Sequence, residues 1–277
     1  MNPANMFVLD SVKLRANAER LAHVYQSAEP FPHVVIDDFL PADALRRVAD
    51  NFPGAGDINW FDFNNPRQRK LAAEDETQIE DNARWLLYQF NSATFINFLE
   101  KLTGIAGLIS DPFFIGGGLH QIERGGYLKV HADFNRHPKF KLDRRLNLLL
   151  YLNENWQDEY GGHLELWNRD VTRCVRKILP TFNRCVIFNT TDLSYHGHPE
   201  PLRCLRGMTR KSLALYYYSN GRPETEVSDD HGTLVQPRPG ELIHGLNGRS
   251  LGMSLKSVFR RCVPPIFSEM RGYLTRK

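Results

Sequence analysis

The sequence has few cysteines, and none of them lies close to another. Its four cysteines are Cys174, Cys185, Cys204 and Cys262, and no two of them form a Cys-x-x-Cys pair. A chain of 277 residues is also longer than the small secreted scaffolds that depend on disulfides. The composition therefore predicts reduced thiols and argues against a disulfide framework.

Long apolar runs are also absent. No stretch reaches the roughly 18 uncharged apolar residues that a membrane-spanning helix needs. The first ten residues lack the basic region and apolar core of a secretory signal. We therefore expect a protein without a transmembrane segment, located in the cytoplasm.

Neither sign of charge is in large excess. The 35 basic residues stand against 32 acidic ones, which gives a net charge of +3. This balance is too mild to indicate binding to a phosphate backbone, so we predict no nucleic-acid partner. A hydrophobic content of 42% is enough for one good-sized core, so we expect one catalytic domain with extensions.

The pattern of apolar residues divides the chain into three parts. Residues 1–112 predict a lead-in of helices and strands that packs on a core, residues 113–220 predict the core, and residues 221–277 predict a C-terminal extension. Within the lead-in we expect helices over 10–28, 41–52 and 83–102, a strand over 32–39 and a polar loop over 60–81. We interpret the Arg and Lys residues of that loop as a solvated edge, with a lid over a site as the alternative.

From residue 113 the sequence consists of short apolar segments separated by turn residues. We expect strands over 114–115, 118–122, 127–131, 146–152, 163–167, 177–179, 184–189 and 212–219. Many short strands with turns at this spacing indicate a sandwich or barrel. The predicted class is mainly β with flanking helices (α+β) around a jelly roll, a double-stranded β-helix. Residues 221–248 predict an irregular excursion, and the basic segment 251–277 predicts a packed or solvated tail, with membrane contact as the alternative.

One short motif carries the first indication of chemistry, His131-Ala132-Asp133. Residues two apart in a strand point to the same face, so this imidazole and this carboxylate project side by side. Together with a second His, they would form the two-His-one-carboxylate face of non-haem Fe(II) sites. By itself the pair is equally compatible with a surface turn or a hydrogen-bonded His/Asp pair.

Two later motifs make the metal interpretation stronger. His196 and His198 each supply a candidate third ligand, and the spacing alone leaves both open. Beyond them, Arg210 and Ser212 share one face of a predicted strand, where a guanidinium and a hydroxyl could bind a carboxylate. This order of motifs is much rarer than any one of its parts.

In this order of motifs the chain resembles the Fe(II)- and 2-oxoglutarate-dependent oxygenases, and among them the prolyl-4-hydroxylase-like group. The resemblance runs from about residue 113 to 220 and includes the segments 145–153 and 160–167. It implies Fe(II) bound by His131, Asp133 and His196, with His198 as the rival of His196. It also implies 2-oxoglutarate as cosubstrate, O2 as oxidant and ascorbate as a stimulant.

The resemblance further implies roles for the residues around the metal. Arg210 would hold the far carboxylate of 2-oxoglutarate, with hydrogen bonds from Ser212 and Tyr151. Asn147 shares the strand face of Tyr151 and would line the same cofactor-binding pocket. Because related halogenating enzymes replace the carboxylate ligand with a small residue, Asp133 favours hydroxylation, with release of succinate and carbon dioxide.

Two other functions remain as alternatives at this stage. A cupin-like jelly roll could bind a metal or ligand without oxidising anything. A zinc hydrolase would use similar ligands, although no separate general base is indicated by spacing. The substrate is expected to be a peptide or a small molecule. The motifs do not specify it further, because loops such as 60–81 and 136–143 would select it.

Overall fold

One antiparallel sheet forms the centre of the molecule, for which the computed structural model describes residues 7–243. Its strands are β1 (His33–Ile36), β2 (Phe61–Asn65), β3 (Gln68–Ala73), β4 (Ile109–Ser110), β5 (Gly118–Glu123), β6 (Tyr127–Ala132), β7 (Asp143–Tyr151), β8 (Leu164–Trp167), β9 (Cys174–Ile178), β10 (Cys185–Asn189), β11 (His196–His198), β12 (Thr209–Ser219) and β13 (Leu234–Val235). The described helices are α1 (Ser11–Gln26), α2 (Ala42–Asp50), α3 (Asp81–Phe90), α4 (Ala93–Thr103) and the 3-10 turns η2 (Asp158–Tyr160) and η3 (Glu224–Glu226). The predicted class, mainly β with flanking helices around a jelly roll, is confirmed.

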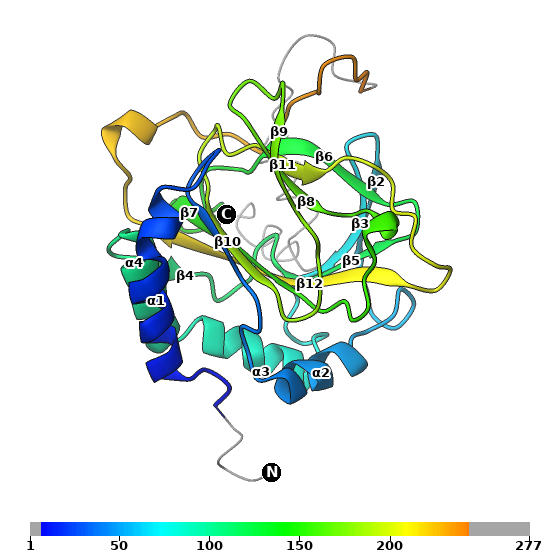
Figure 1. Cartoon of the computed structure of the whole chain (residues 1–277), viewed down its shortest axis with the longest axis horizontal. Helices are drawn as coiled ribbons and strands as arrows, with labels where there is room; N and C mark the ends of the chain where they lie inside the picture. Colours follow the sequence, from blue (N-terminus) through cyan, green and yellow to red (C-terminus); the bar gives the residue numbers. More distant parts are fainter. Residues whose placement is uncertain (1–6, 244–277) are drawn as a thin grey trace, which may run out of the picture.

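The order of the strands brings distant segments of the chain together. Hydrogen-bonded neighbours follow the path β1-β10-β7-β12-β5-β3-β6-β11-β8-β9, while β13 pairs with β6, β2 with β3 and β4 with β12. The sheet curls around an interior, with β12 and β5 on one side and β6 and β11 on the other (Figure 1). Side chains that point into this interior can therefore converge from strands far apart in sequence.

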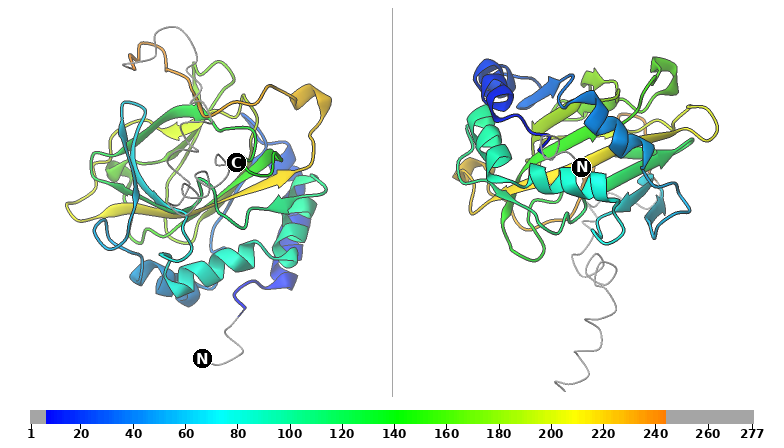
Figure 2. Two further views of the ribbon diagram at one scale, coloured as in Figure 1. Left: turned by 180° about the vertical axis from the view of Figure 1, so that it is seen from behind. Right: turned by 90° about the horizontal axis from the view of Figure 1, so that it is seen from below.

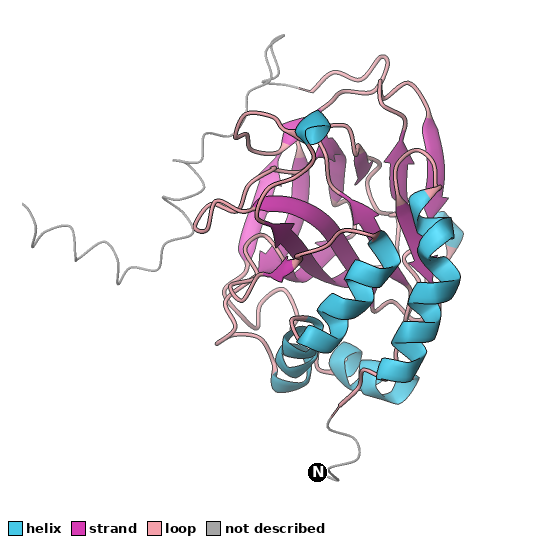
Figure 3. Ribbon diagram, turned by 90° about the vertical axis from the view of Figure 1, so that its left-hand side faces the viewer, coloured by secondary structure: helices cyan, strands magenta, loops and turns pink. Residues whose placement is uncertain are grey.

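The helices cover the outer face of one half of the sheet (Figures 2 and 3). The side chains of β7 alternate between the core beneath the helices and the interior pocket. Leu148 and Leu150 belong to the core beneath the helices, whereas Asn147 and Leu149 line the interior pocket. The predicted first helix is confirmed, and Asp10 caps it by accepting hydrogen bonds from the amides of Val12 and Lys13.

The prediction of a loop over residues 60–81 was wrong. This segment contains the hairpin of β2 and β3, and β3 lies within the sheet between β5 and β6. Asn65 forms the turn, because its side-chain oxygen accepts hydrogen bonds from the amides of Arg67 and Gln68. The hairpin was missed because β2 is a mostly exposed edge strand and β3 begins with polar residues, so neither shows clean apolar alternation.

Three further predictions need correction. The expected helix over 83–102 is two helices, because Ser92 caps a new start and accepts a hydrogen bond from the amide of Phe95. The expected strand over 114–115 is a turn, in which Phe114 has a positive φ of 50°. The segment of His196 and His198, which is missing from the expected strands, is strand β11.

Residues 221–243 follow an irregular course and include a short segment that pairs with β6, the strand that carries His131. Leu234 pairs with Ala132 and Val235 with His131, and the amide of Gln236 donates to the carbonyl of Val130 at 2.9 Å. We call residues 226–236 the strap. The basic tail predicted over 251–277 lies outside the described residues, and the three-part division of the chain stays a prediction. Within residues 7–243 no helix has the length and apolar character required to cross a bilayer.

The strap carries a partly buried ion pair that should make its attachment depend on pH. His231 Nε2 lies 2.8 Å from Asp192 Oδ1. Burial alone would lower the pKa of His231, but the hydrogen bond to Asp192 outweighs it and the pKa is raised above 6.5. A raised folded pKa stabilises the strap fully below the unfolded value, and this contribution is lost as pH rises through the folded value. The hydrogen bond from His231 lowers the pKa of Asp192. The stability that Asp192 contributes is therefore lost only as pH falls below about 3.8.

We therefore expect strap attachment to weaken as the pH rises above about 6.5. The measurement is hydrogen exchange of the Gln236 amide, corrected for the intrinsic pH dependence of exchange. His231→Gln should show weaker protection at pH 6 and little further loss at higher pH. An identical pH profile for this variant and the unchanged protein would contradict the assignment.

Candidate metal and cosubstrate site

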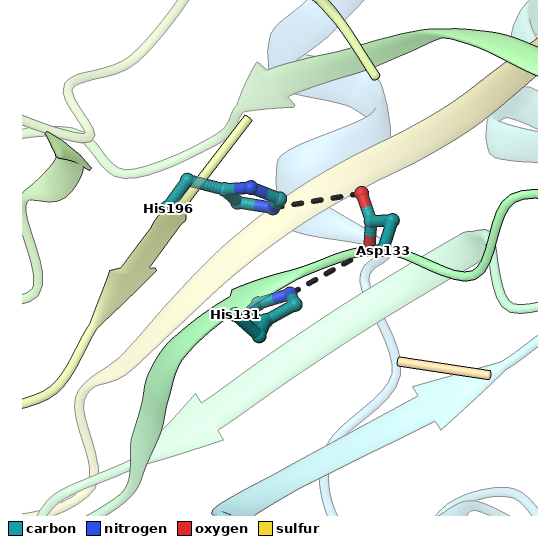
Figure 4. A group of neighbouring side chains, drawn as sticks. All are labelled: His131, Asp133 and His196. Atoms are coloured by element: carbon teal, nitrogen blue, oxygen red, sulfur yellow. Dashed lines mark ion pairs between the residues drawn. The ribbon is translucent and has the colours of Figure 1, made fainter. Parts of the chain in front are cut away.

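Strand register places three candidate ligands at one point. His196 on β11 pairs directly with His131 on β6, and Asp133 follows the end of β6 by one residue. His131 Nε2 lies 3.5 Å from Asp133 Oδ1, and His196 Nε2 lies 3.6 Å from Asp133 Oδ2. One ligand atom from each residue falls within 4.8 Å of the others. Figure 4 shows both imidazoles turned toward the carboxylate.

Backbone hydrogen bonds set the imidazoles for metal binding. Nδ1 of His131 lies 2.8 Å from the carbonyl of Lys129, and Nδ1 of His196 lies 2.9 Å from the carbonyl of Ser194. Because a carbonyl can only accept, each Nδ1 carries the proton and each Nε2 presents a lone pair. Burial and the neighbouring His131 lower the pKa of His196 to about 4, so this ring is neutral at pH 7.

A buried arginine and an amide hold the carboxylate. Arg144 Nη2 and Asn147 Nδ2 donate to Asp133 Oδ2 at 2.9 and 3.1 Å. Burial alone would raise the pKa of Asp133, but nearby positive charge, chiefly that of the Arg144 guanidinium, holds it well below its usual range. A set of two imidazole nitrogens and one ionised carboxylate fits Fe(II). Arg144 is stacked over the ring of Tyr216 at 3.5 Å, and sequence reasoning missed it.

The predicted cosubstrate residues lie in the same interior pocket. Arg210 and Ser212 on β12 line it, with the candidate ligands and Asn147. Arg210 Nε donates to the carbonyl of Gly162 at 2.8 Å, and its Nη2 donates to the hydroxyl of Tyr151 at 3.2 Å. No carboxylate pairs with Arg210 among the described residues, although its side chain is buried. A buried guanidinium without an acid partner is suited to an anionic ligand.

Gly162 allows this close approach. Its φ is +71°, and a Cβ atom at this position would lie 2.6 Å from the side chain of Leu202 and 3.0 Å from that of Arg210. A larger residue would be strained in its backbone and would displace the guanidinium. The Gly161-Gly162 pair therefore serves the pocket as well as the turn.

Two other side chains of the pocket differ from expectation. His198 also lies on β11, where it pairs with Leu128 of β6, but it is not part of the cluster of three donors. Both of its ring nitrogens are buried without a hydrogen-bond partner, and it lines the pocket. Lys70 on β3 also lines the pocket, whereas the sequence indicated a solvated edge. Its strand was not recognised, so no sequence pattern pointed to it.

Comparison with known proteins points to the same family as the sequence motifs. The family model described as the 2OG-Fe(II) oxygenase superfamily matches residues 117–218, which contain the three candidate ligands, Arg210 and Ser212. The resemblance to 2-oxoglutarate oxygenases drawn from the sequence is thereby confirmed.

Proteins similar to this chain include several prolyl hydroxylases. Prolyl 3-hydroxylase OGFOD1 of Mus musculus is 22% identical over 204 residues, 71% of this chain and 35% of that protein. The chain thus spans about a third of the length of this relative.

Solved structures of prolyl hydroxylases share the fold. A Trichoplax adhaerens prolyl hydroxylase in complex with a hypoxia inducible factor peptide fragment has a TM-score of 0.55 at 20% identity, covering 76% of this chain and 94% of that one. A Pseudomonas putida prolyl-4-hydroxylase has a TM-score of 0.51 at 17% identity, covering 75% of this chain and 100% of that one. These likenesses show that this chain has the fold of prolyl hydroxylases.

Substitution of the two β11 histidines should separate their roles. We expect His196→Gln to weaken Fe(II) or Ni(II) binding by at least about 100-fold, because it removes a donor of the cluster. His198→Gln should change metal affinity by less than about threefold, because His198 is not one of the three converging donors. Metal titration followed by calorimetry measures both. A large loss of affinity in His198→Gln alone would reverse the ligand assignment.

Proposed function

We propose that this chain is an Fe(II)- and 2-oxoglutarate-dependent dioxygenase that hydroxylates an unactivated C–H bond, with prolyl-type substrates as the first class to test. The observation that carries the proposal is the convergence of His131 Nε2, His196 Nε2 and Asp133 in one pocket with Arg210. The likeness in fold to prolyl hydroxylases supports the choice of first substrates.

Each reactant has residues suited to it. His131, Asp133 and His196 would hold Fe(II), and Arg210, with Tyr151 and Ser212 beside it, would bind the far carboxylate of 2-oxoglutarate. When bound, these groups supply the oxidation: one O2 converts 2-oxoglutarate to succinate and carbon dioxide and inserts one oxygen atom into the substrate C–H bond. Everything else in the pocket concerns binding and orientation.

The chain's own contribution is a fixed ligand geometry in a partly apolar pocket. Arg144 and Asn147 both donate to Asp133 Oδ2, so the carboxylate cannot turn freely. Ile122, Leu128, Leu149 and Leu164 line the same pocket and limit the access of water. The resulting site favours a bound substrate over solvent near the metal ligands.

A non-oxidative, cupin-like binding module is the less favoured alternative. Such a module would need the metal ligands. It would not need the buried guanidinium of Arg210, which has no carboxylate partner among the described residues, in the same pocket. Burying an unpaired charge is unfavourable, so its presence requires a binding role. Arg210 therefore favours the oxygenase, because 2-oxoglutarate carries a second carboxylate at a suitable end.

The test is the stoichiometry of turnover in the purified full chain. With Fe(II), ascorbate, 2-oxoglutarate and air, we expect succinate, carbon dioxide and consumed O2 in equal amounts, all abolished by a chelator. Proline-containing peptides and free proline are then added to look for faster turnover. Binding of 2-oxoglutarate to the Mn(II)-loaded protein is measured in parallel. A metal-loaded protein that fails to bind 2-oxoglutarate would refute the proposal and favour the binding module.

A further inference from the structure

Positive charge exceeds negative charge in the pocket. Among residues 7–243, Asp133 is the one acidic side chain that lines it, whereas Lys70 and Arg210 both line it and Arg144 lies against Asp133. The pocket and its wall thus hold three cations and one carboxylate. Adding Fe(II) and 2-oxoglutarate leaves the excess unchanged, because a dication and a dianion cancel. The loaded site would still lack negative charge.

Lys70 is the cation without an assigned partner. Arg144 pairs with Asp133 at 2.9 Å, and Arg210 is assigned above to the cosubstrate. Among residues 7–243, the side chain of Lys70 makes no hydrogen bond and no ion pair, and its aromatic partner is the ring of Phe63, whose centroid lies 5.3 Å from Nζ. A cation left unpaired in a pocket is unfavourable unless a ligand neutralises it.

The strand positions Lys70 over the interior. Gln68 and Arg69 pair with β6, while residues 71–73 pair with β5, so Lys70 stands where β3 passes from one neighbour to the other. Lys70 is partly exposed as a residue, although its charged group is buried.

The charges of the pocket act on the ammonium of Lys70. Burial lowers the pKa of Lys70 to about 8, and among charged neighbours Asp133 acts on it most strongly, ahead of Arg144 and Arg210. Lys70 and the three candidate ligands line the same pocket, so the ammonium shares that space with them.

Building on the proposed function, we propose that Lys70 recognises an anionic group of the primary substrate. The substrate class is then an organic acid whose carboxylate lies near the C–H bond to be oxidised, rather than a neutral internal segment of a peptide. In this role Lys70 is a specificity-determining residue. Its ammonium would bind the carboxylate beside the metal ligands, while Arg210 binds the cosubstrate.

The experiment uses acetate as the carboxylate probe and acetamide as its neutral isostere. The full chain is loaded with Mn(II) and 2-oxoglutarate, and the paramagnetic relaxation of the probe's methyl protons is titrated. We expect acetate to bind about tenfold or more tightly than acetamide. Lys70→Met should abolish the difference, Lys70→Arg should retain most of it, and Arg69→Met, a charge removed from the opposite face of β3, should leave it unchanged.

Several outcomes would overturn the inference. Equal relaxation by acetate and acetamide in the unchanged protein refutes it without any variant, so a poorly folded variant cannot hide the answer. An acetate preference that persists in Lys70→Met also refutes it, since the metal itself would then be the binding site. A Lys70→Met variant that loses 2-oxoglutarate affinity as strongly as acetate affinity would reassign Lys70 to the cosubstrate.

The same titration separates this inference from the proposed function. Relaxation of the 2-oxoglutarate protons reports whether the cosubstrate binds at the metal. If those protons are unaffected by Mn(II), the proposed function and the role of Lys70 fall together. If they relax but acetate does not, only the role of Lys70 is refuted.

Discussion

Asp133→Ala is expected to abolish turnover and also to destabilise the fold. Removing the carboxylate opens one side of the metal site, and we expect a loss of activity beyond about 100-fold, because even residues that only support ligands cost up to that much. It also leaves Arg144, whose side chain is 1% exposed, as a buried charge without its ion pair. Breaking a buried pair in this way costs about 3–5 kcal/mol in the free energy of unfolding. Metal titration and urea unfolding measure the two effects.

The two effects of this substitution can be separated in a double variant. Arg144→Met in the Asp133→Ala background removes the orphaned charge and should restore much of the stability. It should not restore metal binding, because the carboxylate ligand is still missing. A double variant that regained turnover would show that Asp133 acts through the fold and not as a ligand.

Arg210→Met should give the opposite combination of effects. We expect 2-oxoglutarate affinity to fall by about 2–5 kcal/mol, or roughly 30- to 5,000-fold, because a buried charge partner of the cosubstrate is truncated. Metal affinity should stay the same, because Arg210 makes no contact with the three donors. The unliganded protein should be at least as stable as before, because a buried cation without an acid partner has been removed.

The measurements are 2-oxoglutarate titration of the metal-loaded protein and urea unfolding without cosubstrate. Lys211→Met is the matched control, since Lys211 is the next residue of β12 and points to the opposite face. It should leave 2-oxoglutarate affinity unchanged. An unchanged 2-oxoglutarate affinity in Arg210→Met would refute the role of Arg210 in binding the cosubstrate carboxylate.

Strand periodicity and motif order were enough to select the main residues of the site. His131 and Asp133 are two apart in a strand, and Arg210 and Ser212 repeat that spacing, so each pair could be placed on a face without a structure. The choice between His196 and His198 depended on the resemblance, because both lie two apart on what proved to be one strand. The register that sets His196 opposite His131 cannot be read from either segment alone.

Residues whose roles arise from tertiary contacts were not predictable. Arg144 is the first of two adjacent arginines in the chain, and only the curl of the sheet brings it to Asp133. The position of Lys70 in the pocket was not predicted, because the polar sequence of its hairpin was interpreted as a loop. The division of the 83–102 segment was different in kind, because Ser92 is a recognisable helix cap that could have indicated the break.

The pairing of β13 with β6 determines where this chain can be shortened. The family match ends at residue 218, yet Leu234 and Val235 cover the backbone of β6 beside His131. A fragment cut after residue 220 would leave that backbone as an open strand edge, a template for pairing with other chains. Such a fragment should aggregate during expression even though it contains every candidate ligand. The smallest well-behaved enzyme therefore extends to at least the end of the strap.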